Sequence, residues 1–209
     1  MPKVNFRLYV ITNRLLCGDR SLAQVVGDAC KAGVKAIQLR EKDIPAKFVY
    51  NLAQEIQQIC KKNGTKLLIN DRFDIAEAVG ADGVHLTSKS LPVEIIRKNF
   101  NSDKLVGVST HSLEEARRAQ DSGADFVLFG PIYPTLSKAA YGHPQGLTKL
   151  QEVAKSVAIP VFAVGGITPE KARECVESDA FGVAVISSVM SSRNISATLK
   201  SYEDYLGRL

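Results

Sequence analysis

The 209-residue sequence contains no tryptophan, and aromatic residues make up only 7% of it. Surfaces that stack nucleic-acid bases depend on such side chains, so their scarcity argues against a nucleic-acid partner. No apolar run approaches the length of a membrane span, and the first residues, 1–6, lack the apolar core of a signal peptide. We therefore expect a cytoplasmic protein with no membrane partner.

The sequence also lacks any cysteine pattern that would bind a metal. Cys17, Cys30, Cys60 and Cys175 are widely spaced, with no CxxC or Cys/His motif. This spacing predicts reduced thiols that serve as packing residues. The net charge of +5 is spread along the chain, so it indicates solvated helix faces and supports an acidic small-molecule substrate only weakly.

What is present is a recurring unit of a short apolar strand, a polar turn and an amphipathic helix. In three segments, residues 32–37, 80–85 and 123–128, a helix ends, the chain turns at a small residue and a strand begins. Near-continuous apolar strands predict a parallel sheet covered by helices. The predicted strands are residues 8–11, 36–39, 66–69, 83–86, 105–108, 126–129, 161–164 and 182–185.

These eight strands predict an α/β protein with a (β/α)8 TIM barrel, formed as a single domain of residues 1–209. The alternative is an open doubly wound sheet, whose first strand usually leads into a GxGxxG motif. Here that turn reads Thr12-Asn13-Arg14, which favours the barrel.

Helix start signals support the predicted helices between the strands. Thr168 precedes Pro169, as expected for an N-cap followed by proline at the first helical position. Ser112 with Glu115 fits a capping box. The predicted helices are residues 21–32, 46–62, 73–79, 91–99, 112–122 and 169–177.

Segment 36–42 begins as a buried strand and ends in charge. Since side chains alternate along a strand, Gln38 and Arg40 share one face, and Lys42 continues it if the chain stays extended. Polar groups gathered at the end of a buried strand indicate an anion site. The alternative is a strand that runs out into a solvated loop, because buried charge without a partner is costly.

In a barrel, active-site groups lie at the C-terminal ends of the strands. In this sequence those ends are polar, whereas the beginnings of the strands show no comparable pattern. The polar ends comprise Gln38 to Lys42, Asn70 to Arg72, His85 to Ser88, Ser109 to His111, Gly130 to Lys138, Gly165 to Thr168 and Ile186 to Ser188.

Two of these ends have features of a phosphate site. Gly165-Gly166 leads into the helix capped by Thr168, and Ile186-Ser187 ends the last strand. Glycine lets backbone N–H groups approach an anion, and barrels often bind phosphate after strands seven and eight. The alternative is a Gly-Gly turn that serves tight packing alone.

The cations Arg40, Lys42 and Lys138 follow separate strands and together suit a diphosphate. Asp71 is then a candidate Mg2+ ligand, since Mg2+ takes carboxylate and phosphate oxygens. The alternative for Asp71 is an N-cap of the following helix. The histidines suggest no catalytic triad and are expected to be hydrogen-bonding or packing residues.

Taken together, these segments resemble thiamine phosphate synthase over nearly the whole chain. The resemblance implies a (β/α)8 barrel that joins hydroxymethylpyrimidine diphosphate to thiazole phosphate by a dissociative mechanism. It is carried by Gln38-Leu39-Arg40-Glu41-Lys42, Ile69-Asn70-Asp71-Arg72, and residues 80–86, 107–112, 130–138, 164–168 and 186–187.

The resemblance also assigns roles to residues of this sequence. Arg40, Lys42, Lys138 and Ser109 are the implied catalytic residues, with Ser109 on the pyrimidine, and Asp71 is the implied ligand of the Mg2+ cofactor. Gln38 and Asn70 help to hold the pyrimidine diphosphate. The implied thiazole phosphate ligands are Thr135, Ser137, Gly166, Ile186 and Ser187.

One departure concerns the segment after the fourth strand, where the family carries a second Mg2+-binding aspartate. Ser90 stands in its place, and a neutral hydroxyl is a poor substitute for a carboxylate on Mg2+. The neighbouring Lys89 adds a positive charge that would take over part of the metal's role. The thiazole tautomerase branch of the superfamily carries a histidine where this chain has Pro131.

Three hypotheses follow. The first is the synthase, acting on phosphorylated small molecules. The second is an isomerase of a thiazole carboxylate phosphate, which needs an acid or base such as His143. The third is a non-catalytic ligand-binding or regulatory protein, for which Ser90 is the main support. The sequence leaves a homo-oligomer open.

Overall fold

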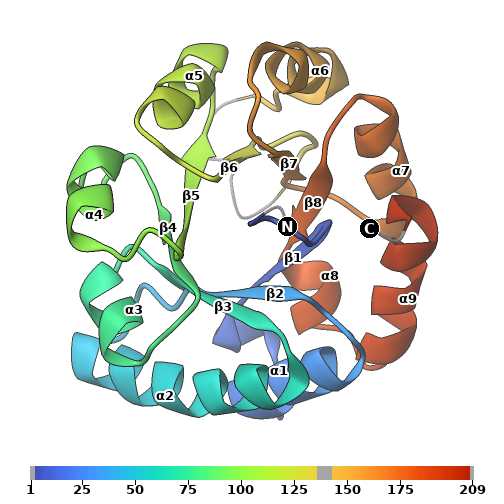
Figure 1. The fold of residues 1–209 in the computed structure, drawn as a ribbon. Helices are drawn as coiled ribbons and strands as arrows, with labels where there is room; N and C mark the ends of the chain where they lie inside the picture. The colour runs from blue at the N-terminus through green and yellow to red at the C-terminus, as the bar shows by residue number, and fades with distance from the viewer. Residues whose placement is uncertain (1–2, 136–142, 208–209) are drawn as a thin grey trace.

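The computed structural model describes residues 3–135 and 143–207. Its parallel strands close into a barrel in sequence order, with β8 paired to β1 (Figure 1). This arrangement confirms the predicted (β/α)8 barrel. The strands are β1 (Leu8–Ile11), β2 (Ala36–Leu39), β3 (Lys66–Asn70), β4 (Gly83–Leu86), β5 (Leu105–Thr110), β6 (Phe126–Phe129), β7 (Val161–Val164) and β8 (Gly182–Val185).

Helices surround the barrel: most lie between successive strands along the chain, and α8 and α9 follow the last strand (Figure 1). None of the helices within the described ranges is long and apolar enough to cross a membrane. They are η1 (Arg14–Leu16), α1 (Leu22–Lys31), α2 (Ala46–Asn63), α3 (Phe73–Ala78), α4 (Val93–Asn99), α5 (Leu113–Asp121), α6 (Gly146–Ser156), α7 (Pro169–Glu177), α8 (Ser187–Met190) and α9 (Ile195–Leu206).

Aromatic side chains fill the inside of the barrel. The ring of Phe126 lies edge-on to those of Tyr9 and Phe162, with centroids 5.5 and 5.4 Å apart. Phe6, just before β1, also contacts Phe126, at 5.8 Å. Offset and edge-on ring pairs are favourable contacts. The interior of the barrel is therefore a packed core.

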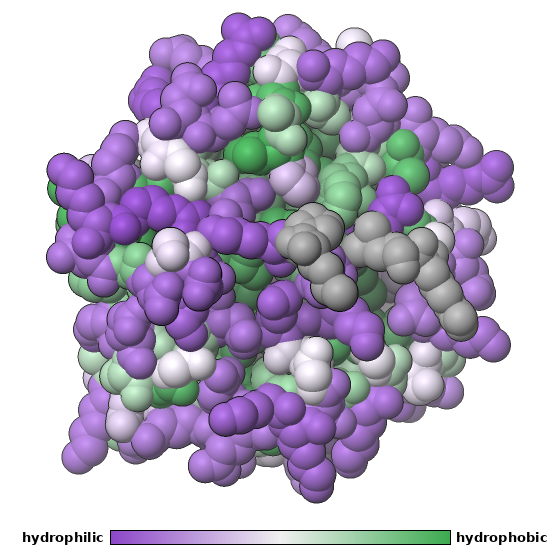
Figure 2. Space-filling model, viewed as in Figure 1, coloured by the Kyte–Doolittle hydropathy of each residue, from purple (hydrophilic) through white to green (hydrophobic). Residues whose placement is uncertain are grey.

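A larger core lies between the outside of the strands and the helices, and all four cysteines are buried and unpaired, as predicted. Alternation along the strands separates the two cores: Ile37 and Leu39 of β2 pack outward, whereas Ala36 packs inward. Figure 2 shows hydrophilic side chains over most of the face in view, with hydrophobic residues between them. The helices thus present polar sides to solvent.

The structure refines several predicted boundaries. Strands β3 and β5 extend to Asn70 and Thr110, because Asn70 pairs with His85 and Thr110 pairs with Phe129. Asn70 and Ser109 therefore lie on strands rather than in the loops that follow them. Helices α6 and α9 were not among the helices predicted from the sequence.

The predicted caps are present, with one difference. Thr168 accepts a hydrogen bond from the backbone of Lys171, and proline begins α7. Ser112 accepts one from Glu115, but the Glu115 carboxylate binds the backbone N–H of His111, so this is not a reciprocal capping box. A reciprocal box does occur at Ser21, at the start of α1.

The barrel closes at a seam where only glycine fits. The backbone N–H of Val183 donates to the Arg7 carbonyl at 2.8 Å. A Cβ added at Gly182 would lie 2.2 Å from that carbonyl oxygen. The seam therefore needs glycine for close approach of the backbones.

We predict that Gly182→Ala lowers the free energy of unfolding by about 1–3 kcal/mol, because the new methyl group forces β1 and β8 apart. Gly27→Ala is the matched control, since its Cβ would meet nothing nearer than 4.0 Å within α1. That change should raise the free energy of unfolding by about 0.5–1 kcal/mol. Urea unfolding measures both, and equal effects at the two glycines would contradict the prediction.

Candidate active site

Several predicted site residues meet at the C-terminal rim of the barrel. Gln38 is 1% exposed and donates through its side-chain amide to the Tyr9 hydroxyl at 3.3 Å. Asn70 pairs with His85 on the next strand, and the imidazole of His85 contacts the hydroxyl of Ser109 on the strand after that. The structure thus places Gln38, Asn70 and Ser109 along neighbouring strands, β2 to β5.

The loop after β2 is held by the buried carboxylate of Glu41, which is 6% exposed. It accepts hydrogen bonds from the Thr12 hydroxyl at 2.7 Å and from the Arg14 backbone N–H at 3.1 Å. The Thr12 hydroxyl in turn accepts from the backbone N–H of Arg40 at 2.9 Å. The loop that carries Arg40 and Lys42 is therefore fixed to the end of β1.

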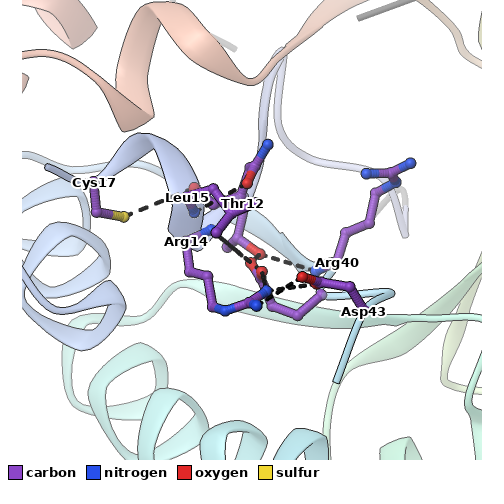
Figure 3. Close-up of polar contacts among 8 residues, drawn as sticks. Thr12, Arg14, Leu15, Cys17, Arg40 and Asp43 are labelled. Carbon is purple, nitrogen blue, oxygen red and sulfur yellow. Dashed lines mark hydrogen bonds and ion pairs between the residues drawn. The ribbon is translucent and has the colours of Figure 1, made fainter. Parts of the chain in front are cut away.

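The guanidinium of Arg14 belongs to this support rather than to the anion site. It contacts Glu41 at 3.2 Å and Asp43 at 2.5 Å, and its hydrogen bond holds the pKa of Asp43 below the usual range. The side chain of Arg40, by contrast, extends away from the cluster (Figure 3). Glu41 and Asp43 thus both contact the guanidinium of Arg14.

Three cations gather beside this loop. Partial burial and then the positive charges of Arg40 and Lys89 lower the pKa of the Lys42 ammonium, and Asp71 partly opposes them. Like charges raise each other's energy unless an anion lies between them. The group therefore favours a multiply charged anion. Lys89 was noted in the sequence for its charge but was not among the predicted site residues.

Asp71 adopts a conformation that sequence reasoning did not foresee. Its φ angle is +65°, in the left-handed region that residues other than glycine seldom adopt. Its backbone N–H donates to the His85 carbonyl at 2.8 Å. The residue at the N-cap of α3 is Arg72, and no side chain caps that helix. The N-cap alternative for Asp71 is therefore wrong, and its exposed carboxylate remains available to a ligand.

The side chain of Ser90 is occupied within its own turn. Its Oγ accepts a hydrogen bond from the Thr87 backbone N–H at 2.9 Å, and its own N–H donates to the Thr87 carbonyl. Within the described residues, no group of three His, Cys, Asp or Glu side chains is placed to hold a metal. A Mg2+ ion here would have one carboxylate, Asp71, which fits an ion that enters with phosphate oxygens and keeps its waters.

A pocket of about 370 Å³ opens at the ends of β7 and β8. Four of the predicted thiazole phosphate ligands, Thr135, Gly166, Ile186 and Ser187, line it. Gly166 has a φ of +67°, and a Cβ there would lie 2.7 Å from the Pro134 carbonyl oxygen. The glycines thus pack closely against the loop after β6 and also line the pocket.

Helix α9 braces this pocket from behind. The hydroxyl of Tyr202, which is fully buried, donates to the Ile167 carbonyl at 2.9 Å. It also lies 2.8 Å from the hydroxyl of Ser188. One side chain therefore ties the turn before α7 to the start of α8. Tyr202 is not among the residues predicted from the sequence, where the only signal for it is an aromatic residue in an amphipathic stretch.

The remaining candidates are two residues that the structure does not describe and the three histidines. Ser137 and Lys138 lie outside the described residues. His143 is exposed. The ring of His111 bonds to the Gly130 carbonyl and that of His85 to Ser109, so both are hydrogen-bonding residues, as predicted.

We predict that Glu41→Ala lowers the free energy of unfolding by about 2–3 kcal/mol, because the buried hydroxyl of Thr12 and the partly buried backbone N–H of Arg14 lose a charged acceptor. The same change should weaken binding of inorganic diphosphate about tenfold, since the loop carrying Arg40 and Lys42 loosens. Asp43→Ala is the control. Its side chain is 55% exposed, so its loss should cost less than about 1 kcal/mol.

Urea unfolding and titration calorimetry give the two measurements for Glu41. Equal losses of diphosphate binding in Glu41→Ala and Asp43→Ala would show that the buried carboxylate has no special part in holding the loop.

We predict that the buried His85 makes the folded protein less stable at acidic pH. Burial, and then the charges of Arg40 and Lys42, lower its pKa from 6.5 to about 3. Below pH 6.5 the unfolded chain therefore binds a proton at His85 that the folded chain does not bind. The contribution of His85 to the free energy of unfolding is fully present above pH 6.5 and is lost as the pH falls toward 3.

The expected loss of unfolding free energy from His85 alone is about 1.4 kcal/mol per pH unit. Unfolding measured between about pH 6.5 and 5 should show this slope in the parent protein but not in His85→Gln. That window lies above the titration of carboxyl groups whose pKa is lowered. Identical slopes in the two proteins would mean that His85 is not held neutral.

The geometry agrees with what comparison with known proteins shows. A profile described as thiamine monophosphate synthase matches residues 8–189. A protein of Geobacter sulfurreducens is 47% identical over 191 residues, 91% of this chain and 90% of its own. The thiamine-phosphate synthase of Clostridium novyi is 40% identical over 198 residues, 95% of this chain and 97% of its own.

A solved structure has the same fold over its full extent. The thiamine phosphate pyrophosphorylase from Pyrococcus furiosus superposes with a TM-score of 0.88 at 33% identity, covering 98% of this chain and 96% of that one. The profile match, the relatives and the shared fold agree over nearly the whole length. The chain belongs to the thiamine monophosphate synthase family.

Proposed function

We propose that this chain is a transferase that joins hydroxymethylpyrimidine diphosphate to thiazole phosphate, giving thiamine phosphate and diphosphate. The observation that supports the proposal is that two separate groups of residues suited to anions lie at one end of the barrel. One gathers Arg40, Lys42 and Lys89 after β2 and β4. The other is the pocket of glycine and serine after β7 and β8. Two phosphorylated substrates need two such sites.

The roles of individual residues follow the chemistry of the two sites. The cationic site suits the diphosphate, and Ser109 lies at the inner edge of that site, where a pyrimidine ring would reach it. The pocket after β7 and β8 suits a single phosphate. The proposed diphosphate ligands are Gln38, Arg40, Lys42, Asn70 and Lys138, and the proposed thiazole phosphate ligands are Thr135, Ser137, Gly166, Ile186 and Ser187.

The proposed reaction is dissociative. Diphosphate leaves, a pyrimidine-methyl cation forms and the thiazole nitrogen attacks it. The physical demand is stabilisation of the charge on the leaving group, which Arg40 and Lys42 meet. No strong base is needed, and this suits a site whose buried His85 has a pKa of about 3. When bound by Asp71, Mg2+ supplies further positive charge to the diphosphate oxygens.

The isomerase and binding-only alternatives have less support. An isomerase needs an acid or base, and His143 is exposed. A binding-only protein would not need the cations around Lys42 in addition to a phosphate pocket. The unpaired cysteines and the phosphorylated substrates fit a cytoplasmic setting, which we propose as well.

The test is formation of thiamine phosphate from both substrates with Mg2+. We predict that Lys42→Ala raises the KM for the pyrimidine diphosphate at least about tenfold, because a charge-assisted contact is lost, and leaves the KM for thiazole phosphate nearly unchanged. Ser187→Ala should show the reverse pattern. Arg118→Ala is the control, since it removes a 69% exposed cation on α5.

Absence of product at high protein concentration would contradict the synthase. A shift in both KM values together in either variant would contradict the division of the rim into two anion sites.

A further inference from the structure

His85 is a buried polar residue whose purpose the proposed mechanism does not explain. It lies on β4 inside the barrel, is 1% exposed, and packs against the rings of Tyr9 and Phe126 at 5.9 and 5.8 Å. Its Nε2 is 2.9 Å from Oγ of Ser109 on β5. Burying an imidazole in an aromatic core is costly. The hydrogen bond between His85 and Ser109 therefore calls for a functional explanation.

The other ring nitrogen, Nδ1, fixes the direction of that hydrogen bond. Nδ1 is buried and has no hydrogen-bond partner among residues 3–135 and 143–207. It faces Gly107 so closely that a Cβ there would lie 2.6 Å away. Buried N–H groups without an acceptor are rarer than acceptors without a donor. The proton of the neutral ring therefore belongs on Nε2, and Nδ1 keeps its lone pair.

With the proton on Nε2, His85 donates to Ser109 and the oxygen of Ser109 accepts. A serine hydroxyl has one proton of its own to donate. Because Nε2 of His85 already carries a proton, it does not accept the serine proton. The serine proton is therefore available to a ligand at the half-exposed end of Ser109. In the opposite tautomer the proton would be used by Nε2, and Ser109 would offer only lone pairs to a ligand.

We propose that His85 is a positioning residue that orients the Ser109 hydroxyl as a donor toward a hydrogen-bond acceptor on the substrate. The inference rests on the proposed function, and there the acceptor is a ring nitrogen of the pyrimidine rather than its amino group. Gly107 belongs to the same arrangement, because any larger side chain would displace the imidazole.

The first test needs no catalytic activity. In protein labelled with 15N-histidine, NMR correlation of ring nitrogens with ring protons reports which nitrogen carries the proton. His85 is identified as the signal missing from His85→Gln. We expect protonation at Nε2 near neutral pH, and protonation at Nδ1 would overturn the inference.

The second test is a double-mutant cycle with Ser109. His85→Leu should lower kcat/KM for the pyrimidine diphosphate about ten- to a hundredfold, leave the KM for thiazole phosphate unchanged, and cause no further loss in Ser109→Ala. His85→Gln, which retains an N–H donor, should recover part of the rate. Losses that simply add would show that His85 only packs.

The two tests separate the inference from the function. A protein that makes no thiamine phosphate overturns the proposed function, and the NMR spectrum still decides the tautomer. An active protein with Nδ1 protonated keeps the function and loses the inference.

Discussion

Closure of the barrel between β1 and β8 is the constraint on which the rest of the structure depends. Once Gly182 lets β8 approach the Arg7 backbone, the parallel strands form a complete ring, and their C-terminal ends meet at one rim. Alternation then decides which side chains reach that rim. Leu39 packs under the helices, whereas Gln38 points into the barrel beside Tyr9. Barrel closure and alternation thus bring residues that are far apart in the sequence together at the rim.

The second requirement is electrostatic. The rim collects Arg40, Lys42 and Lys89, and partial burial, followed by the charges of the other two cations, lowers the pKa of Lys42. Such a group is stable only if the loop beneath it is held by other interactions, and the buried Glu41 carboxylate provides them through Thr12 and Arg14. On the opposite side of the rim the proposed phosphate site relies on backbone groups and close packing, and Gly166 and Tyr202 fill the corresponding role there.

The sequence predicts the strands well because each is an apolar run bounded by turn residues, as Val161–Val164 is by Pro160 and Gly165. It predicts less where a role depends on a distant partner. Glu41 meets Thr12 across 29 residues of chain, and no local pattern marks that pairing. Asp71 resembled an N-cap because the residue type is right, but its left-handed backbone, bonded to His85, removes it from the helix. The Ser90 departure was visible in the sequence, whereas its hydrogen bond to Thr87 was not.

The central claim is that two distinct anion sites share one rim and hold two substrates side by side. Its most direct test is a crystal structure of the protein with inorganic diphosphate, Mg2+ and thiazole phosphate together. The account predicts diphosphate between Arg40 and Lys42, beside Asp71, and thiazole phosphate against Gly166 and Ser187. Both anions in one pocket, or diphosphate bound away from the loop after β2, would contradict it.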